Sequence, residues 1–135
     1  MGAIDEIWHD AFHNIIPKDP HYSMRLEKGE ECGLLIHLDS PHNQVTLDFG
    51  IVQAVNILDE GIILNVTSPS IQLLRQTGFS SVLYQVENSA YESYIQACMP
   101  RELYQALNLR QYNVVTMNYV VEIIASENPR ITVHT

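Results

Sequence analysis

Residues 44–61 read QVTLDFGIVQAVNILDEG, and this stretch decides the fold that the sequence predicts. Apolar and polar residues alternate up to Gly50, which is typical of a β-strand with one face on a core. After Gly50 the alternation changes phase, so we expect a bulge or bend there, because one extra residue reverses the facing of those that follow. Residues 59–61 then precede a second alternating run from Ile62, which predicts a β-hairpin. We therefore expect this bent strand and its return to form the centre of an antiparallel sheet.

Further strands are predicted on both sides of this stretch. Apolar alternation over 22–27 and 32–38, with a turn between them, indicates that these strands lead into the central one as a meander. Alternation over 82–86 predicts another strand, and the longest regular run, 115–125, predicts a long strand buried beside the central one. Residues 131–133 are expected to be a short edge strand or a tail.

Helices are expected at four places. Over residues 4–16, apolar side chains recur at three- and four-residue steps, which predicts an amphipathic helix packed across the sheet. A short helix is expected over 70–76. Two more should begin at Ser89, which stands at the capping-box spacing before a glutamate, and at Pro100.

These elements predict a single α+β domain over residues 1–135. An antiparallel sheet of about five to seven strands would be covered on one face by the helix over 4–16 and by the shorter helices of the C-terminal half. The competing arrangement is a parallel α/β fold, which needs strands alternating with helices throughout. Residues 22–67 contain no helical pattern, so the antiparallel arrangement is favoured.

The chain is acidic, with a net charge of −9, and the charge is uneven. Residues 1–60 contain 11 acidic and 3 basic residues, which gives them a net charge of −8. Nucleic-acid binding is not expected, because it requires lysine and arginine to displace the counterions of the phosphates. The same charge suits a basic protein partner.

The cytoplasm is the expected compartment. The first residues lack the basic-then-apolar order of a signal peptide, and no apolar run is long enough for a membrane-spanning helix. Cys32 and Cys98 form no CxxC pair, and we expect two buried free thiols. No cofactor is expected, because the sequence has neither a glycine-rich phosphate loop nor a GxSxG motif.

His9 and His13 are the candidate metal ligands. Two histidines four residues apart lie on one face of a helix and can share a metal ion. Asp10, or a carboxylate from the sheet such as Asp48, would then be the general base of a small metal-assisted hydrolase. No third ligand follows at a recognisable spacing, and the histidines avoid the apolar stripe, so a solvated helix face is the simpler interpretation.

Acidic and aromatic side chains are the candidate contacts to a partner. Tyrosine is favoured at protein interfaces because it combines a large apolar body with a polar tip. The candidate partner-binding residues are Asp39, Asp48, Asp59, Glu60, Tyr91 and Tyr94. Asp48 and Glu122 could also face each other, provided that their strands pair.

Two segments carry a resemblance to known proteins. Residues 84–89, YQVENS, with Tyr91 close behind, and residues 116–124, TMNYVVEII, before Pro129, resemble the C-terminal half of small bacterial proteins of unknown function. Some of those acidic single-domain proteins are similar to toxin-neutralising immunity proteins. The resemblance implies a fold and contains no catalytic residue.

The sequence therefore predicts a non-enzymatic binding protein, and in its sharpest form an acidic inhibitor of a basic toxin or nuclease. The partner is expected to be a protein, with self-association as a homodimer also considered. The metal-assisted hydrolase that uses His9 and His13 is the alternative.

Overall fold

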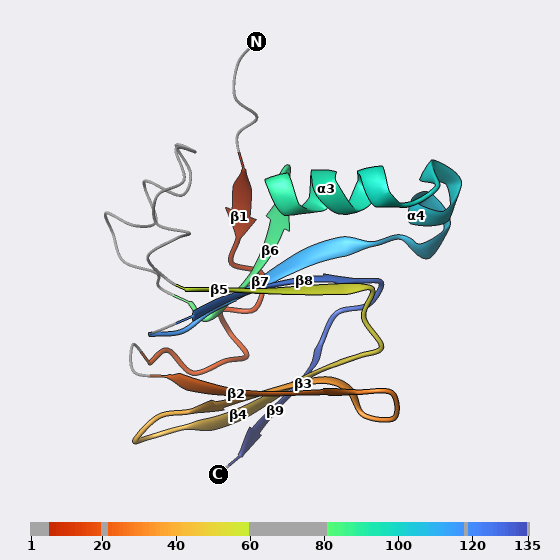
Figure 1. Ribbon diagram of the computed structural model, residues 1–135. Helices are drawn as coiled ribbons and strands as arrows, with labels where there is room; N and C mark the ends of the chain where they lie inside the picture. The colour runs from red at the N-terminus through yellow and green to blue at the C-terminus, as the bar shows by residue number, and fades with distance from the viewer. Residues whose placement is uncertain (1–5, 20–21, 60–80, 118, 135) are drawn as a thin grey trace.

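The computed structural model describes residues 6–19, 22–59, 81–117 and 119–134. Of these residues, 50% lie in strands and 15% in helices. They form two stacked antiparallel sheets and two helices, so the predicted α+β fold with an N-terminal helix is wrong. Figure 1 shows the helices above one sheet and the second sheet below it.

The upper sheet, called sheet A, has the strand order β1-β6-β7-β8-β5, and every neighbouring pair in it is antiparallel. Its strands are β1 (Ile7–His9), β5 (Ala54–Asp59), β6 (Leu83–Glu87), β7 (Arg110–Val115) and β8 (Tyr119–Ala125). The lower sheet, called sheet B, has the order β2-β3-β4-β9, again antiparallel throughout. Its strands are β2 (Ser23–Gly29), β3 (Gly33–Asp39), β4 (Gln44–Gly50) and β9 (Arg130–His134).

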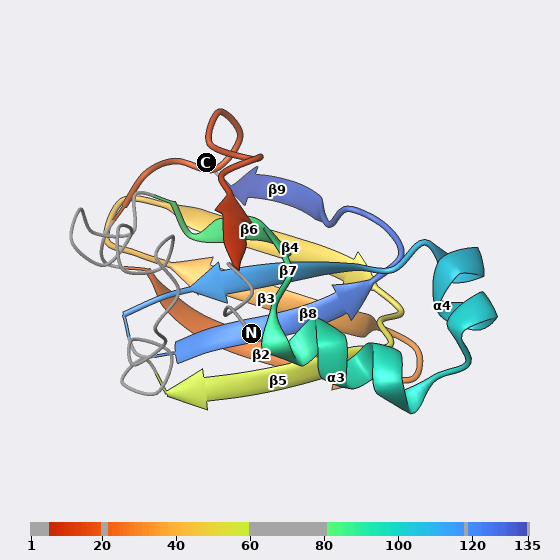
Figure 2. The same cartoon turned by 90° about the horizontal axis from the view of Figure 1, so that it is seen from above.

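The two described helices follow β6. Helix α3 (Ala90–Cys98) lies on the outer face of sheet A, and α4 (Arg101–Leu107) extends beyond the strand ends (Figure 2). The Glu92 backbone N–H donates to Ser89 Oγ at 2.9 Å, so Ser89 is the N-cap that the sequence predicts for α3. The helix predicted from Pro100 is confirmed as α4.

The main hydrophobic core lies between the two sheets. Strand periodicity sends alternate side chains inward, so Leu34, Ile36 and Leu38 from β3 meet Val121 and Ile123 from β8. A smaller cluster on the other face of sheet A contains five buried side chains, and these are Trp8, Tyr84, Val86, Val115 and Val120. Sheet A is therefore buried on both faces, whereas the outer face of sheet B is polar.

The predicted bulge near Gly50 is confirmed. Leu34 pairs with Gly50 and Leu35 with Asp48, so Phe49 is the extra residue on β4. Gly50 has a φ of +65°, and the chain leaves sheet B there to enter sheet A as β5. The phase change therefore marks a crossing between sheets. The expected position at the centre of one sheet is wrong, because β4 is an inner strand of sheet B and β5 is an edge strand of sheet A.

The helix predicted over residues 4–16 is wrong in its described part, which contains strand β1 followed by a turn over residues 11–15. The reason is that the apolar side chains of this segment pack into two different hydrophobic clusters. Trp8 packs against Tyr84 with the two rings tilted, 5.3 Å between ring centroids, in the cluster on the outer face of sheet A. Phe12 and Ile16 instead pack into the core between the sheets. One straight helix could not reach both faces of sheet A.

Most of the other predicted strands are present in the structure. The strands over 22–27, 32–38, 82–86 and 131–133 are confirmed as β2, β3, β6 and β9. The strand predicted over 115–125 is confirmed for its part from Tyr119 to Ala125, which is β8, is largely buried and pairs with β5 of the central stretch. Its start is wrong, because the Thr116 backbone N–H donates to the carbonyl of Tyr119 at 3.0 Å and closes a turn between β7 and β8. The hairpin return from Ile62 and the helix over 70–76 lie outside the described residues.

The two cysteines are free, as the sequence predicts, but both are exposed and not buried. Cys32 lies in the turn between β2 and β3, and Cys98 is the last residue of α3. None of the helices in the described ranges is long and apolar enough to cross a membrane.

Candidate functional site

The predicted partner-binding residues do not form one patch. Asp39 ends β3 and Asp48 lies on β4, both in sheet B, whereas Asp59 ends β5 in sheet A. Tyr91 and Tyr94 lie on α3, on the far side of sheet A from Asp39 and Asp48. Glu60 lies outside the described residues.

The two candidate metal ligands are not on one helix face, because the helix is absent. His9 lies on β1, with its Nε2 atom 3.5 Å from Glu87 Oε2, and His13 lies in the following turn, with Nδ1 3.1 Å from the carbonyl of Asp10. In the described part of the chain, no group of three or more His, Cys, Asp or Glu side chains is placed to hold a metal ion. No observation therefore favours the metal-assisted hydrolase.

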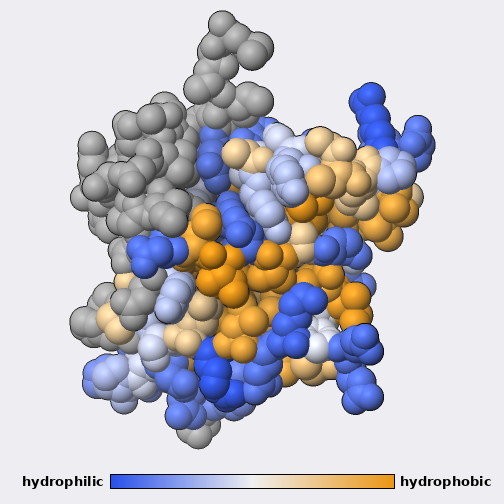
Figure 3. Space-filling model, in the orientation of Figure 1, coloured by the Kyte–Doolittle hydropathy of each residue, from blue (hydrophilic) through white to orange (hydrophobic). Residues whose placement is uncertain are grey.

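Among the described residues, an apolar surface is left uncovered where the edge strands β5 and β2 run along the same side of the molecule. It is called the open edge here and consists of Met24, Leu26, Val52, Val55 and Ile57. Figure 3 shows hydrophobic residues gathered between the edges of the two sheets on this side. The first four residues are half-buried at the rim of the main core, and Ile57 is 50% exposed.

The open edge follows from the crossing at Gly50. The main core is closed where sheet A and sheet B overlap, but β5 and β2 are each the last of the described strands in their sheet. The inward-facing side chains of these strands, such as Ile57 and Leu26, therefore lie at the rim of the overlap. Contiguous apolar surface of this kind is typical of sites where another molecule binds.

Acidic residues lie at both ends of the open edge. Glu30 and Glu31 are exposed in the turn between β2 and β3. That turn of sheet B and the start of β5 in sheet A lie at the same end of the two layers in Figures 1 and 2. Asp59 lies at the opposite end, as the last residue of β5. Lys28 is the basic residue nearest to the glutamates along the chain. Of the six predicted contact residues, Asp59 is thus the one that adjoins the open edge.

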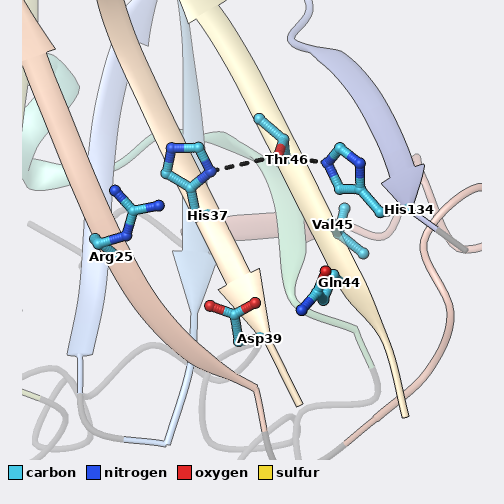
Figure 4. Close-up of a pocket in the computed structure, with 7 residues that line it drawn as sticks. All are labelled: Arg25, His37, Asp39, Gln44, Val45, Thr46 and His134. Atoms are coloured by element: carbon cyan, nitrogen blue, oxygen red, sulfur yellow. Dashed lines mark hydrogen bonds between the residues drawn. The ribbon is translucent and has the colours of Figure 1, made fainter. Parts of the chain in front are cut away.

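A small polar pocket lies on the outer face of sheet B (Figure 4). It has a volume of about 360 Å³ and is lined by Arg25, His37, Asp39, Gln44, Val45, Thr46 and His134. The Thr46 hydroxyl oxygen lies 3.4 Å from His37 Nδ1 and 2.9 Å from His134 Nε2. Because a hydroxyl has one proton, Thr46 can donate to one imidazole and must accept from the other.

The charges around this pocket are largely satisfied within sheet B. Arg25 Nη1 lies 2.5 Å from Glu27 Oε1, and His37 Nε2 lies 3.5 Å from Glu27 Oε2. The hydrogen bond from Arg25, and then the nearby imidazole of His37, hold the pKa of Glu27 below its usual value. The Thr46 oxygen occupies the space between the two imidazoles in Figure 4, so the pair is not arranged as a metal site.

A buried polar cluster lies between α3 and sheet A. Asn56, Glu122 and Asn113 are directly paired across β5, β8 and β7. The amide groups of Asn56 and Gln111 donate to the two carboxylate oxygens of Glu122, at 3.0 and 3.3 Å. Gln111 in turn accepts from the hydroxyl of Ser89. Glu122 and Asp48 belong to different sheets, so the expectation that they could face each other is wrong.

Burial controls the electrostatics of this cluster. It raises the pKa of Glu122, although hydrogen bonds from Asn56 and Gln111 partly oppose that effect. Burial, together with the nearby carboxylate of Glu122, raises the pKa of Tyr91 to about 12. Tyr91 therefore keeps its proton at neutral pH and is partly buried, whereas Tyr94 is 65% exposed and is free to meet a partner.

Sequence reasoning missed most of the open edge and the whole of the polar pocket. The signal for the open edge is present in β5, whose sequence AVNILD combines apolar alternation with a lack of basic residues. The pocket has no such local signal, because Thr46 and His134 are 88 residues apart along the chain.

Comparisons with protein-family models, with curated proteins and with solved structures give no match for this chain. The resemblance to toxin-neutralising immunity proteins therefore stays a prediction, and the function must be argued from the surface.

Proposed function

We propose that this chain is a binding protein that neutralises a basic protein partner, such as a toxin or nuclease, by covering one of its surfaces. The observation that carries the proposal is the open edge: an apolar surface that the described residues leave uncovered, with acidic residues toward both ends, on a chain with a net charge of −9.

The two features have separate physical roles. Burying the half-exposed side chain of Ile57 and its half-buried neighbours removes apolar area from water, which favours association by about 25 cal/mol per Å² before the costs of binding are subtracted. The acidic residues Glu30, Glu31 and Asp59 attract a basic partner, which speeds the encounter and disfavours acidic competitors.

The proposed compartment is the cytoplasm. Cys32 and Cys98 are free and exposed, and thiols of this kind are kept reduced in a cytoplasmic environment. Two exposed thiols would be open to oxidation and cross-linking in a secreted protein.

The experiment is to co-express the chain with the products of the genes beside its own and to measure complex formation by size-exclusion chromatography with light scattering. We expect a complex with a basic protein that forms at low salt and weakens as salt is added. In a growth assay, co-expression of this chain should abolish the toxicity of the partner. The proposal fails if no neighbouring gene encodes an effector and no basic protein co-purifies at low salt. A concentration-dependent homodimer without another partner would also contradict it.

A further inference from the structure

The polar pocket on the outer face of sheet B lies over two rows of side chains that cross the strands. Neighbouring members of a row are directly paired residues of adjacent strands, and the rows are Arg25, His37 and Thr46, and Asp39, Gln44 and His134. Directly paired side chains project from the same face of a sheet, with Cβ atoms about 5 Å apart. In Figure 4, the side chains of Asp39 and Gln44 lie next to each other at the lower end of the pocket.

The two rows differ in how many of their polar groups are already engaged. The side chains of the first row contact Glu27 or one another. The side chains of Asp39 and Gln44 are exposed, and within the described part of the chain neither makes a hydrogen bond or an ion pair. Since Glu27 offsets the charge of Arg25, the carboxylate of Asp39 is an unpaired negative charge in the lining of the pocket.

We propose that this pocket binds the guanidinium group of an arginine side chain on the basic partner. The two carboxylate oxygens of Asp39 accept from the forked N–H donors of the guanidinium, and the side-chain oxygen of Gln44 accepts from a further N–H. An ammonium group has no such fork, so arginine fits this pair of side chains better than lysine. The identity of the partner rests on the proposed function, and the pocket adds a second contact site to it.

Other ligand classes fit the lining less well. An anion would be repelled by Asp39, and the chain has a net charge of −9. A neutral ligand such as a sugar would leave the carboxylate of Asp39 without a counter-charge, and the lining contains no aromatic side chain on which a sugar ring could stack. Asp39 is also one of the contact residues that the sequence predicts, although the sequence does not indicate the pocket around it.

The first test uses N-acetyl-arginine amide as the probe. Its controls are N-acetyl-citrulline amide, which has nearly the same shape without the charge, and N-acetyl-lysine amide, which has the charge without the fork. Amide NMR spectra of the folded protein give the dissociation constant and locate the bound probe. We expect the arginine probe to bind with a millimolar dissociation constant and to shift residues 39, 44 and 46 most. Binding should be about fivefold or more weaker for citrulline and about twofold or more weaker for lysine.

Two variants of the protein carry the same change of charge. Asp39→Asn removes the carboxylate from the pocket, whereas Glu127→Gln removes one from an exposed position between β8 and β9. Both positions are exposed, so both variants should fold, which circular dichroism checks. We expect Asp39→Asn to weaken binding of the arginine probe about fivefold or more and Glu127→Gln to leave it within about twofold. Gln44→Glu adds a carboxylate beside Asp39 and should strengthen binding about threefold or more.

Several outcomes would overturn the inference. They are absence of binding at millimolar arginine probe, equal affinity for the arginine and citrulline probes, binding of the lysine probe as tight as that of arginine, and equal effects of Asp39→Asn and Glu127→Gln.

The natural partner gives a separate test. Asp39→Asn should weaken the complex with the basic partner about fivefold or more, and Glu127→Gln should leave it within about twofold. If the partner binds Asp39→Asn as tightly as the unmodified chain, the pocket is not a contact site, while the binding function stands. If no basic partner is found, the proposed function fails, and binding of the arginine probe would then assign the pocket to a small guanidinium compound instead.

Discussion

Replacing Gly33 with alanine should destabilise the fold much more than the same change at Gly50, although the two glycines have nearly equal φ angles of +66° and +65°. Alanine in this left-handed region costs about 1–2 kcal/mol, partly offset by about 0.4–1 kcal/mol from the restricted unfolded chain. For Gly50, no atom beyond the residue itself and its two chain neighbours would lie within 4 Å of the new Cβ. The expected loss for Gly50→Ala is therefore about 1 kcal/mol.

At Gly33 the new Cβ meets backbone that cannot move aside. It would lie 2.2 Å from the carbonyl oxygen and 2.4 Å from the carbonyl carbon of Gly50. Strands β3 and β4 must separate at the bulge, which disturbs Leu34 and Phe49 in the main core and adds about 1–3 kcal/mol. The expected loss for Gly33→Ala is about 2–4 kcal/mol. Urea denaturation followed by circular dichroism measures both variants. Equal losses would refute the close approach of β3 and β4 at the bulge.

Three further predictions follow from the buried polar cluster and the cysteines. Burial raises the pKa of Glu122, so the stability that the protonated carboxyl contributes is fully present below the unfolded pKa and is lost as the pH rises through the folded pKa. Glu122→Gln should therefore raise the melting temperature near pH 7, and the gain should shrink toward pH 4. A lower melting temperature of Glu122→Gln at pH 7 would contradict this. Ser89→Ala should cost about 1–2 kcal/mol in chemical denaturation because it removes the N-cap of α3, whereas Ser93→Ala, at an exposed position of the same helix, should change stability by less than about 0.5 kcal/mol. Cys32 and Cys98 should both react with a thiol reagent in the folded protein without denaturant, and protection of either thiol would contradict its exposed position.

Sheet B could be predicted from the sequence because one of its faces is polar. In β3 and β4 the buried residues alternate with residues of the outer face, so a period of two is visible along the chain. The bulge at Gly50 was also predictable, since it appears as a change in that period. What the change could not indicate is that the chain leaves the sheet there.

Sheet A could be predicted only in part, because it is buried on both faces. Strand β7 has buried side chains at five successive positions, and two of them, Gln111 and Asn113, are polar. The usual alternation is therefore absent from β7, and the sequence pattern over 115–125 predicts one strand where the structure has a turn before β8. The N-terminal segment fails for a related reason: Trp8 and Phe12 are spaced as in a helix, but they belong to cores on opposite faces of the sheet.

The open edge could not be predicted as a surface, because it depends on which strands end the two sheets. Val55 and Ile57 have the pattern of ordinary core residues, and only the order of strands in sheet A leaves Ile57 half-exposed. The separation of Tyr94 from Asp39 and Asp48 likewise depends on the stacking of the sheets, so acidic and aromatic content alone could not define a patch.

The path of the chain through the two sheets has a consequence for how the protein folds. After β1, the chain builds three strands of sheet B, crosses at Gly50 to build the other four strands of sheet A, and returns to sheet B with β9. The hairpins of β2, β3 and β4 are local and can form early, whereas pairing of β9 with β4 must close a long loop. Neither sheet is complete without strands from distant parts of the chain. We therefore expect both sheets to unfold in one cooperative transition and to refold slowly for a protein of this size, with the closing of β9 among the last steps.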